Sequence, residues 1–122
     1  MTDGLDPFQL AEQRIRVMKI RESLPNFDYD EYQPPKEDKK FVKLVQKEKV
    51  VLEDGHEYEG QWNTKTKMKH GKGYQIWYDG SIYEGYWKFD KAYGRGRLIH
   101  ADGDIYDGDW VDDRAHGFGT YI

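Results

Sequence analysis

The second half of this chain repeats one short phrase of aromatic residues and glycine. The phrase Tyr-x-Gly-x-Trp occurs three times, starting at Tyr58, Tyr83 and Tyr106. A Gly-x-Gly phrase follows each copy, and the first glycines of these phrases, Gly71, Gly94 and Gly117, are 23 residues apart. A fixed period of this length indicates a repeat array, in which each unit buries its apolar face against its neighbours.

Each repeat also contains an Asp-Gly pair flanked by residues typical of β-strands. Asp-Gly favours the tight type I′ turn of a β-hairpin, in which both turn residues have positive φ. The sequence therefore predicts three hairpins, pairing strands 48–53 with 56–62, 72–78 with 81–87, and 95–101 with 104–110. A last strand, 118–122, has no hairpin partner in this scheme.

Side chains two residues apart in a strand point to the same face. The Tyr, Gly and Trp of each phrase should therefore line one face of the sheet, where the bare glycine lets a neighbouring ring lie on the backbone. This set is the predicted repeat core and groove: Tyr58, Gly60, Trp62, Tyr83, Gly85, Trp87, Tyr106, Gly108 and Trp110. The predicted fold is mainly β, a single-layer array of stacked hairpins with an N-terminal helix and an extended arm.

The composition fits a thin core built from rings. Hydrophobic residues make up 37% and charged residues 34% of the chain, yet there are ten Tyr, five Phe and four Trp. Without cysteine, the chain has no disulfides, thiolate metal ligands or thiol nucleophile. No apolar run approaches the ~20 residues of a membrane-spanning helix. A formal net charge of −4 argues against nucleic acid as a general partner.

Residues 1–25 form the predicted N-terminal helix. Asp6 suits the N-cap, Pro7 suits the first helical position, and Pro25 disfavours helix at Leu24. The apolar residues fall into two stripes on roughly opposite sides, Phe8, Ala11, Ile15 and Met18 on one and Leu10, Val17, Ile20 and Leu24 on the other. One stripe could pack on the repeats and the other on a partner, or the stems of the helix's arginines and lysine could cover both.

Residues 26–47 form a predicted linker, acidic and aromatic at first and then basic. Pro34 and Pro35 favour an extended conformation within it. Its few aliphatic residues and many charges favour a disordered tether. The alternative is that its aromatic residues lie along another surface.

The candidates for chemistry are few. His70 and His116 precede Gly-x-Gly phrases where the middle repeat has Tyr93, so we interpret them as rings packed at a loop end. They lie too far apart to share a metal easily, and no nucleophile and base stand together in a catalytic arrangement. We therefore predict no catalytic, cofactor-binding or metal-binding residues.

This set of phrases resembles the MORN repeat, whose pattern has Tyr-x-Gly-x-Trp, a short loop, Gly-x-Gly and a turn glycine. The resemblance covers about residues 48–122, and it departs from the pattern in the loop after Trp62, which is two residues longer than its counterparts. It implies a non-catalytic structural adaptor that binds protein partners in a large cytoskeletal assembly. Among such assemblies, the radial spoke of the ciliary axoneme is the expected one, with a cytoplasmic, cytoskeletal location.

Charge suggests an alternative function. Basic residues gather ahead of the repeats and in the first loop, and those expected to touch acidic lipid or an acidic partner are Lys39, Lys40, Lys43, Lys65, Lys67 and Lys69. Each could add about 1 kcal/mol near an anionic membrane. The alternative hypothesis is thus a peripheral phosphoinositide adaptor, and a third is the regulatory front of a longer enzyme. In the helix, the residues expected to bind a partner are Phe8, Leu10, Ile15, Val17, Met18 and Ile20.

The segment 118–122 predicts an end-on contact. It is an apolar strand whose outer edge has no partner in the expected scheme, and an uncovered edge invites pairing with another chain. Repeat arrays normally need polar caps at their ends. We therefore expect the array to continue beyond residue 122 or a partner to cover the edge, and we expect Met1 to be the natural start.

Overall fold

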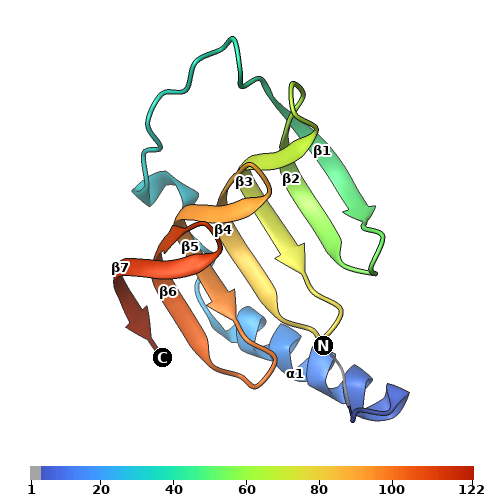
Figure 1. The fold of residues 1–122 in the computed structure, drawn as a ribbon. Helices are drawn as coiled ribbons and strands as arrows, with labels where there is room; N and C mark the ends of the chain where they lie inside the picture. The colour runs from blue at the N-terminus through green and yellow to red at the C-terminus, as the bar shows by residue number, and fades with distance from the viewer. Residues whose placement is uncertain (1–3) are drawn as a thin grey trace.

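The computed structural model describes residues 4–122 and shows one antiparallel sheet of seven strands in chain order, with a helix against one face (Figure 1). The strands are β1 (Leu44–Val51), β2 (Glu57–Asn63), β3 (Met68–Ile76), β4 (Ile82–Lys88), β5 (Lys91–Ile99), β6 (Ile105–Val111) and β7 (Arg114–Tyr121). The helix is α1 (Pro7–Ser23). The predicted fold class, a single layer of stacked hairpins with an N-terminal helix, is confirmed.

The Asp-Gly turns have a different geometry from the one expected. Only the glycine of each pair has positive φ, 85° at Gly55, 97° at Gly80 and 96° at Gly103. In the middle turn the N–H of Trp77 donates to the carbonyl of Ser81, and that of Gly80 to the carbonyl of Trp77, both at 2.9 Å. These are three-residue loops, in which a type I turn is followed by a glycine in the left-handed region, so the type I′ prediction was wrong.

The isolated last strand was also wrong, because β7 begins at Arg114 and pairs with β6. The link is Asp112–Asp113, with φ of 47° and 69°, and Phe89–Asp90 joins β4 to β5 with the same values. Positive φ at both central residues is the type I′ pattern, here formed without glycine. The carboxylate of Asp113 offsets part of the strain by accepting the N–H of Ala92 at 2.7 Å.

Tyrosine and tryptophan rings build the core on one side of the sheet, which we call the aromatic face. Its buried residues are Tyr58, Tyr83, Trp87, Ala92, Tyr106 and Trp110. The indole N–H of Trp87 donates to the carbonyl of Gly73 at 3.1 Å, and that of Trp110 donates to Gly96 at 3.0 Å. A Cβ at Gly96 would overlap the ring of Tyr83, so this close approach requires glycine. The rings of the three phrases therefore pack together in one cluster.

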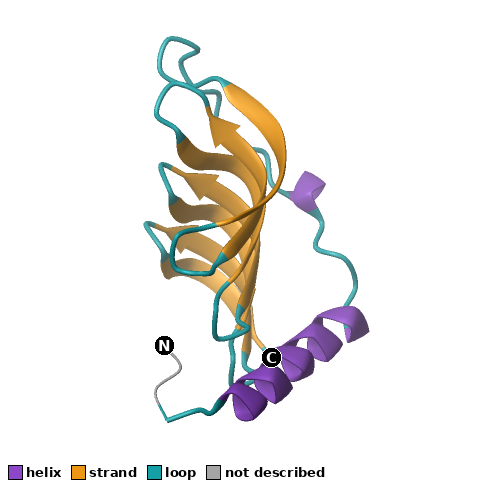
Figure 2. Cartoon of the chain, turned by 90° about the vertical axis from the view of Figure 1, so that its right-hand side faces the viewer, coloured by secondary structure: helices purple, strands orange, loops and turns teal. Residues whose placement is uncertain are grey.

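The opposite side of the sheet, which we call the helix face, is covered by α1 (Figure 2). Asp6 caps the helix by accepting the N–H of Gln9 at 2.8 Å, and Leu24 is the C-cap, as the sequence predicts. Val17 is completely buried and packs with Ile82, Ile99 and Ile105. Residues 1–3, the start of the expected N-terminal segment, lie outside the described residues.

The arm between α1 and β1 continues along the helix face, so the expectation of a free tether was wrong. It contains a short 3-10 helix, Tyr29–Glu31, and both Tyr29 and Tyr32 stack edge-on against Tyr86. The hydroxyl of Tyr86 donates to the carbonyl of Tyr29 at 2.6 Å. Figure 2 shows α1 and the short helix on the same side of the sheet.

Candidate functional site

A groove runs over the aromatic face, which neither α1 nor the arm covers. It has a volume of about 430 Å³ and lies mainly over β3, β4 and β5. Its aromatic and apolar lining is Trp77, Tyr83, Trp87, Ala92, Leu98 and Trp110, and its polar lining is Lys69, Gln75, Asp79, Ser81, Asp90, His100 and Asp113. An apolar floor with a few polar groups around it is the usual make-up of a binding site.

The tyrosines that support this floor are fixed in one orientation. Tyr58 and Tyr83 donate their hydroxyl protons to the backbone carbonyl of the residue that follows the phrase glycine, Gln61 at 2.7 Å and Tyr86 at 2.8 Å respectively. Burial raises the pKa of both hydroxyls well above the ordinary value, so both remain protonated donors. Each ring also meets the next tryptophan edge-on, Tyr83 with Trp110 at 5.3 Å between centroids. The floor is therefore a rigid, pre-formed surface.

Lys69 crosses one end of the groove. Its ammonium nitrogen lies 4.2 Å from the centroid of the Trp87 ring and donates to the amide oxygen of Gln75 at 2.6 Å. Burial lowers the pKa of this ammonium, while the nearby carboxylates of Asp90 and Asp113 oppose the shift. Lys69 is thus an amphipathic part of the groove wall, held by a cation–π contact, and not the freely solvated loop lysine that its sequence context suggests.

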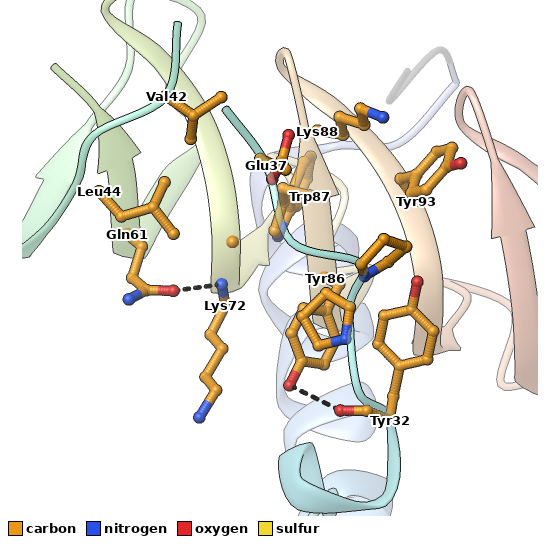
Figure 3. Close-up of a pocket in the computed structure, with 13 residues that line it drawn as sticks. Tyr32, Glu37, Val42, Leu44, Gln61, Lys72, Tyr86, Trp87, Lys88 and Tyr93 are labelled. Atoms are coloured by element: carbon orange, nitrogen blue, oxygen red, sulfur yellow. Dashed lines mark hydrogen bonds between the residues drawn. The ribbon is translucent and has the colours of Figure 1, made fainter. Parts of the chain in front are cut away.

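A second pocket lies between the arm and strands β1 to β5 (Figure 3). Its volume is about 310 Å³, and its lining includes Pro34, Pro35, Val42 and Leu44. Tyr32, Tyr86 and Tyr93 gather on one side of it in Figure 3, where the dashed line from Tyr86 reaches the backbone of Tyr32. The pocket is therefore shaped by the arm itself and depends on how the arm is anchored.

One polar anchor of the arm is a contact between Glu37 and His70. Both oxygens of Glu37 lie within hydrogen-bond distance of the His70 Nε2, at 2.8 and 2.9 Å. The N–H of Phe89 donates to the other ring nitrogen, Nδ1, at 3.2 Å, which places the ring proton on Nε2. His70 is buried and its ring packs edge-on against Phe89, as predicted for a ring at a loop end, whereas His116 is exposed.

The helix residues expected to bind a partner have different surroundings. Val17 is fully buried, and Met18 and Ile20 pack beside it on the helix face. Phe8 and Ile15 are 73% and 56% exposed, and Leu10 is half-buried. The outward stripe is therefore short, with two exposed large apolar residues about two turns apart.

Of the lysines predicted to touch an acidic partner, five are exposed: Lys39, Lys40, Lys43, Lys65 and Lys67. Within residues 4–122, no group of three or more His, Asp or Glu side chains is placed to hold a metal ion. In the same part of the chain, no helix combines the length and the apolar character that crossing a membrane requires.

The profile of the MORN repeat family matches residues 67–82, 83–105 and 106–122. The chain is a MORN-repeat protein. In this MORN array the second and third matched repeats begin at Tyr83 and Tyr106, the first residues of two Tyr-x-Gly-x-Trp phrases. A search among curated proteins found no match. MORN repeats are commonly protein- or membrane-binding scaffolds and are generally not enzymes.

Sequence reasoning missed two features of this MORN protein. The Glu37–His70 contact joins residues 33 positions apart, and no local pattern links them. The inward position of Lys69 depends on Gln75, six residues further along β3, and on Trp87, which the register of β3 and β4 brings close to it. A weak signal existed for Lys69, because the equivalent positions 92 and 115 hold alanine, which is typical of packed sites.

Proposed function

We propose that this protein is a non-catalytic adaptor that binds an extended segment of another protein in the groove of the aromatic face. The observation that carries the proposal is the difference between the two faces. The helix face is covered by α1 and the arm, whereas the aromatic face carries a groove of about 430 Å³ with a rigid aromatic floor. Clustered tryptophan and tyrosine are the side chains that most often dominate protein interfaces.

The chemistry of the groove indicates the kind of segment. Trp77 and Leu98 offer apolar contact, while the carboxylates of Asp79, Asp90 and Asp113 line the same groove with a single cation, Lys69. A partner segment that alternates apolar and basic residues would match this lining. We place the adaptor in a cytoskeletal assembly of several subunits, and we take the ciliary axoneme and its radial spoke as the first place to look. This location rests on the resemblance to MORN scaffolds alone.

The experiment compares a groove variant with a helix variant in a quantitative pull-down from native extract. Leu98→Ser changes the groove lining, and Ile15→Ser changes the outward side of α1. We expect Leu98→Ser to lose the specific partners that wild type retains, and Ile15→Ser to retain them. Thermal melts of both variants must first show folded protein. Retention of all partners by Leu98→Ser, with loss by Ile15→Ser, would transfer the binding site to the helix.

The exposed lysines near β1 support a second candidate function, binding of anionic membranes. Lys39, Lys40 and Lys43 precede β1, and Lys65 and Lys67 lie in the β2–β3 loop. Acidic neighbours at Glu37, Asp38 and Glu48 weaken the local positive charge. Flotation with phosphoinositide-containing vesicles tests it: membrane binding through these lysines must fall steeply with added salt. Absent or salt-insensitive flotation would reject the lipid function.

A further inference from the structure

The two strand pairs inside the array share a side-chain hydrogen bond that marks a correct junction between repeats. At the β3–β4 junction the indole N–H of Trp87 donates to Gly73, and at the β5–β6 junction that of Trp110 donates to Gly96. In both junctions a phrase glycine lies opposite a Gly-x-Gly glycine, Gly85 opposite Gly73 and Gly108 opposite Gly96. Each internal junction between repeats thus combines a tryptophan donor from one repeat with a glycine acceptor from the repeat before it.

At one end of the sheet the donor half of this junction has no acceptor. Trp62 is the first of the three phrase tryptophans along the chain, and its indole N–H is buried with no hydrogen-bond partner among the described residues. Its neighbouring strand β1 has Lys47, not glycine, opposite Gly60, and the register of the β1–β2 pair is irregular between Lys47 and Val50. A cavity of about 230 Å³, bounded by Lys47, Val50 and Trp62, lies at this junction.

Strand β1 is therefore a poor match for β2. Seven of its eight residues are exposed, and only Val50 is half-buried. A strand with so little burial loses few contacts when it leaves the sheet. By contrast, a Gly-x-Gly strand in the same place would supply the carbonyl that Trp62 lacks.

At the other end of the sheet the acceptor half has no donor. Strand β7 carries Gly117 and Gly119 in the positions that Gly94 and Gly96 occupy in β5. Within residues 4–122 no strand pairs with its outer edge, so the carbonyl of Gly119 has no tryptophan to meet. Phe118, Tyr121 and Ile122 are 89%, 76% and 68% exposed along this edge. An open edge with exposed apolar residues is a template for another strand.

The charges of the two ends are also complementary. Lys43, Lys47 and Lys49 flank or form β1, and Lys65 and Lys67 lie close by in the β2–β3 loop. At the β7 end the sheet carries Asp107, Asp109, Asp112 and Asp113, opposed by Arg114 and by Arg95, which pairs with Asp107 at 3.0 Å. Opposite charges at the two ends favour a head-to-tail approach of identical copies over a head-to-head one.

We propose that copies of this chain associate head-to-tail, with β7 of one copy pairing with β2 of the next in place of β1. By the register of the two internal junctions, Gly119 would face Gly60 and Thr120 would face Glu59 of the next copy. Trp62 would then donate to Gly119, and the array would continue across the boundary between copies. A head-to-tail contact uses a different surface on each copy, so repeated pairing produces a ring where the rotation between copies closes and a filament where it does not.

Cross-linking between copies tests the register directly, because the natural chain contains no cysteine. Thr120→Cys and Glu59→Cys change exposed residues at opposite ends of the sheet, so one copy cannot form this bond within itself. We expect an equimolar mixture of the two variants to form a disulfide-linked heterodimer on mild oxidation. The control mixture replaces Glu59→Cys with Glu48→Cys, an exposed position on β1. Cross-linking in the control equal to or above that in the test mixture would overturn the proposed replacement of β1.

A second measurement separates assembly from folding. Trp62→Phe removes a donor that is unpaired in a single copy, whereas Trp87→Phe removes one already bonded to Gly73. In sedimentation velocity over a range of concentrations, we expect Trp62→Phe to weaken self-association about 2- to 10-fold, the range for one net hydrogen bond. Trp87→Phe should lower stability and leave self-association unchanged at temperatures where it is folded. Wild type that stays monomeric at every concentration, or equal effects of both variants on association, would refute the proposal.

Discussion

The two faces of the sheet bury their side chains in different ways. On the helix face, aliphatic residues such as Ile82 and Ile99 are covered by Val17 of α1, and the arm continues this cover to Tyr86. On the aromatic face, Tyr83 and Trp87 are 1% and 4% exposed although no other segment of residues 4–122 lies over them. The aromatic face is self-covering, because each ring lies against the glycines and rings of the neighbouring strand.

This difference explains why the chain needs its N-terminal segment. A single-layer sheet has two faces, and aliphatic side chains cannot shield one another as large rings over glycine can. The helix face therefore requires α1 as a second layer. The self-covering face keeps a groove available to a partner, which is the basis of the proposed function.

The largest expected effect comes from removing a ring at the centre of the aromatic face. Trp87→Ala should lower the free energy of unfolding by about 3–5 kcal/mol, because it deletes a buried ring and its hydrogen bond to Gly73. Urea denaturation measures this loss. Trp62→Ala, at the half-buried end position, is the matched comparison and should cost clearly less. A near-normal melting temperature for Trp87→Ala would show that the rings do not hold the stack together.

A smaller loss is expected when a methyl group is placed under a ring. Gly96→Ala should lower the unfolding free energy by about 1–3 kcal/mol, because a Cβ there overlaps the ring of Tyr83. Gly103→Ala is the control for glycine itself, since its Cβ would meet only Ile20 at 3.6 Å while its φ of 96° carries the backbone strain alone. Gly96 itself has no positive φ, so a Gly96→Ala variant as stable as wild type in calorimetry would show that the close approach of the Tyr83 ring does not require glycine.

On the helix face, one substitution on the buried side of α1 and one on its exposed side test whether the helix covers the sheet. Val17→Ala should cost about 1–3 kcal/mol of stability, because its side chain is fully buried against Ile82 and Ile99. Ile15→Ala, on the outward side of α1, should change stability by less than about 0.5 kcal/mol. Chemical denaturation of both variants checks the pair, and a similar small effect at both positions would mean that α1 does not cover the sheet.

The smallest expected change concerns the anchor of the arm. Glu37→Ala removes the acceptor of the buried His70 Nε2 proton and should destabilise the fold by about 1–3 kcal/mol, toward the lower limit because Glu37 itself is partly exposed. Glu37→Gln keeps an acceptor oxygen and should retain more of the stability. Amide exchange at Phe89, whose N–H donates to His70, reports the local effect. Unchanged exchange in both variants would show that the anchor does not order this loop.

Most of the array could be predicted from the sequence, because the residues that contact one another recur at fixed positions in each repeat. Tyr58, Tyr83 and Tyr106 recur with their glycines in register, and alternation along a strand places them on one face without further information. The helix boundaries followed from Asp6, Pro7 and Pro25 for the same reason, since capping is a local effect.

The rest depended on contacts that local patterns do not carry. The turns at Phe89–Asp90 and Asp112–Asp113 adopt positive φ without glycine, held in part by carboxylates that bond to backbone N–H groups 21 residues earlier. The arm looked too polar to fold, yet Tyr29, Tyr32 and Glu37 find partners on a sheet formed later in the chain. The groove lining combines phrase positions that are the same in each repeat of this chain with residues such as Trp77 and Leu98 that differ between the repeats.

The most direct test of the account places a photo-reactive amino acid on each side of the molecule. His100 lines the groove with a 54% exposed side chain, and Ile15 lies on the outward side of α1. Each position receives the probe in turn, and proteins cross-linked in native extract are identified by mass spectrometry. We expect the probe at position 100 to capture a defined protein that the probe at position 15 does not. Capture of the same protein from position 15 alone would contradict it and assign binding to the helix.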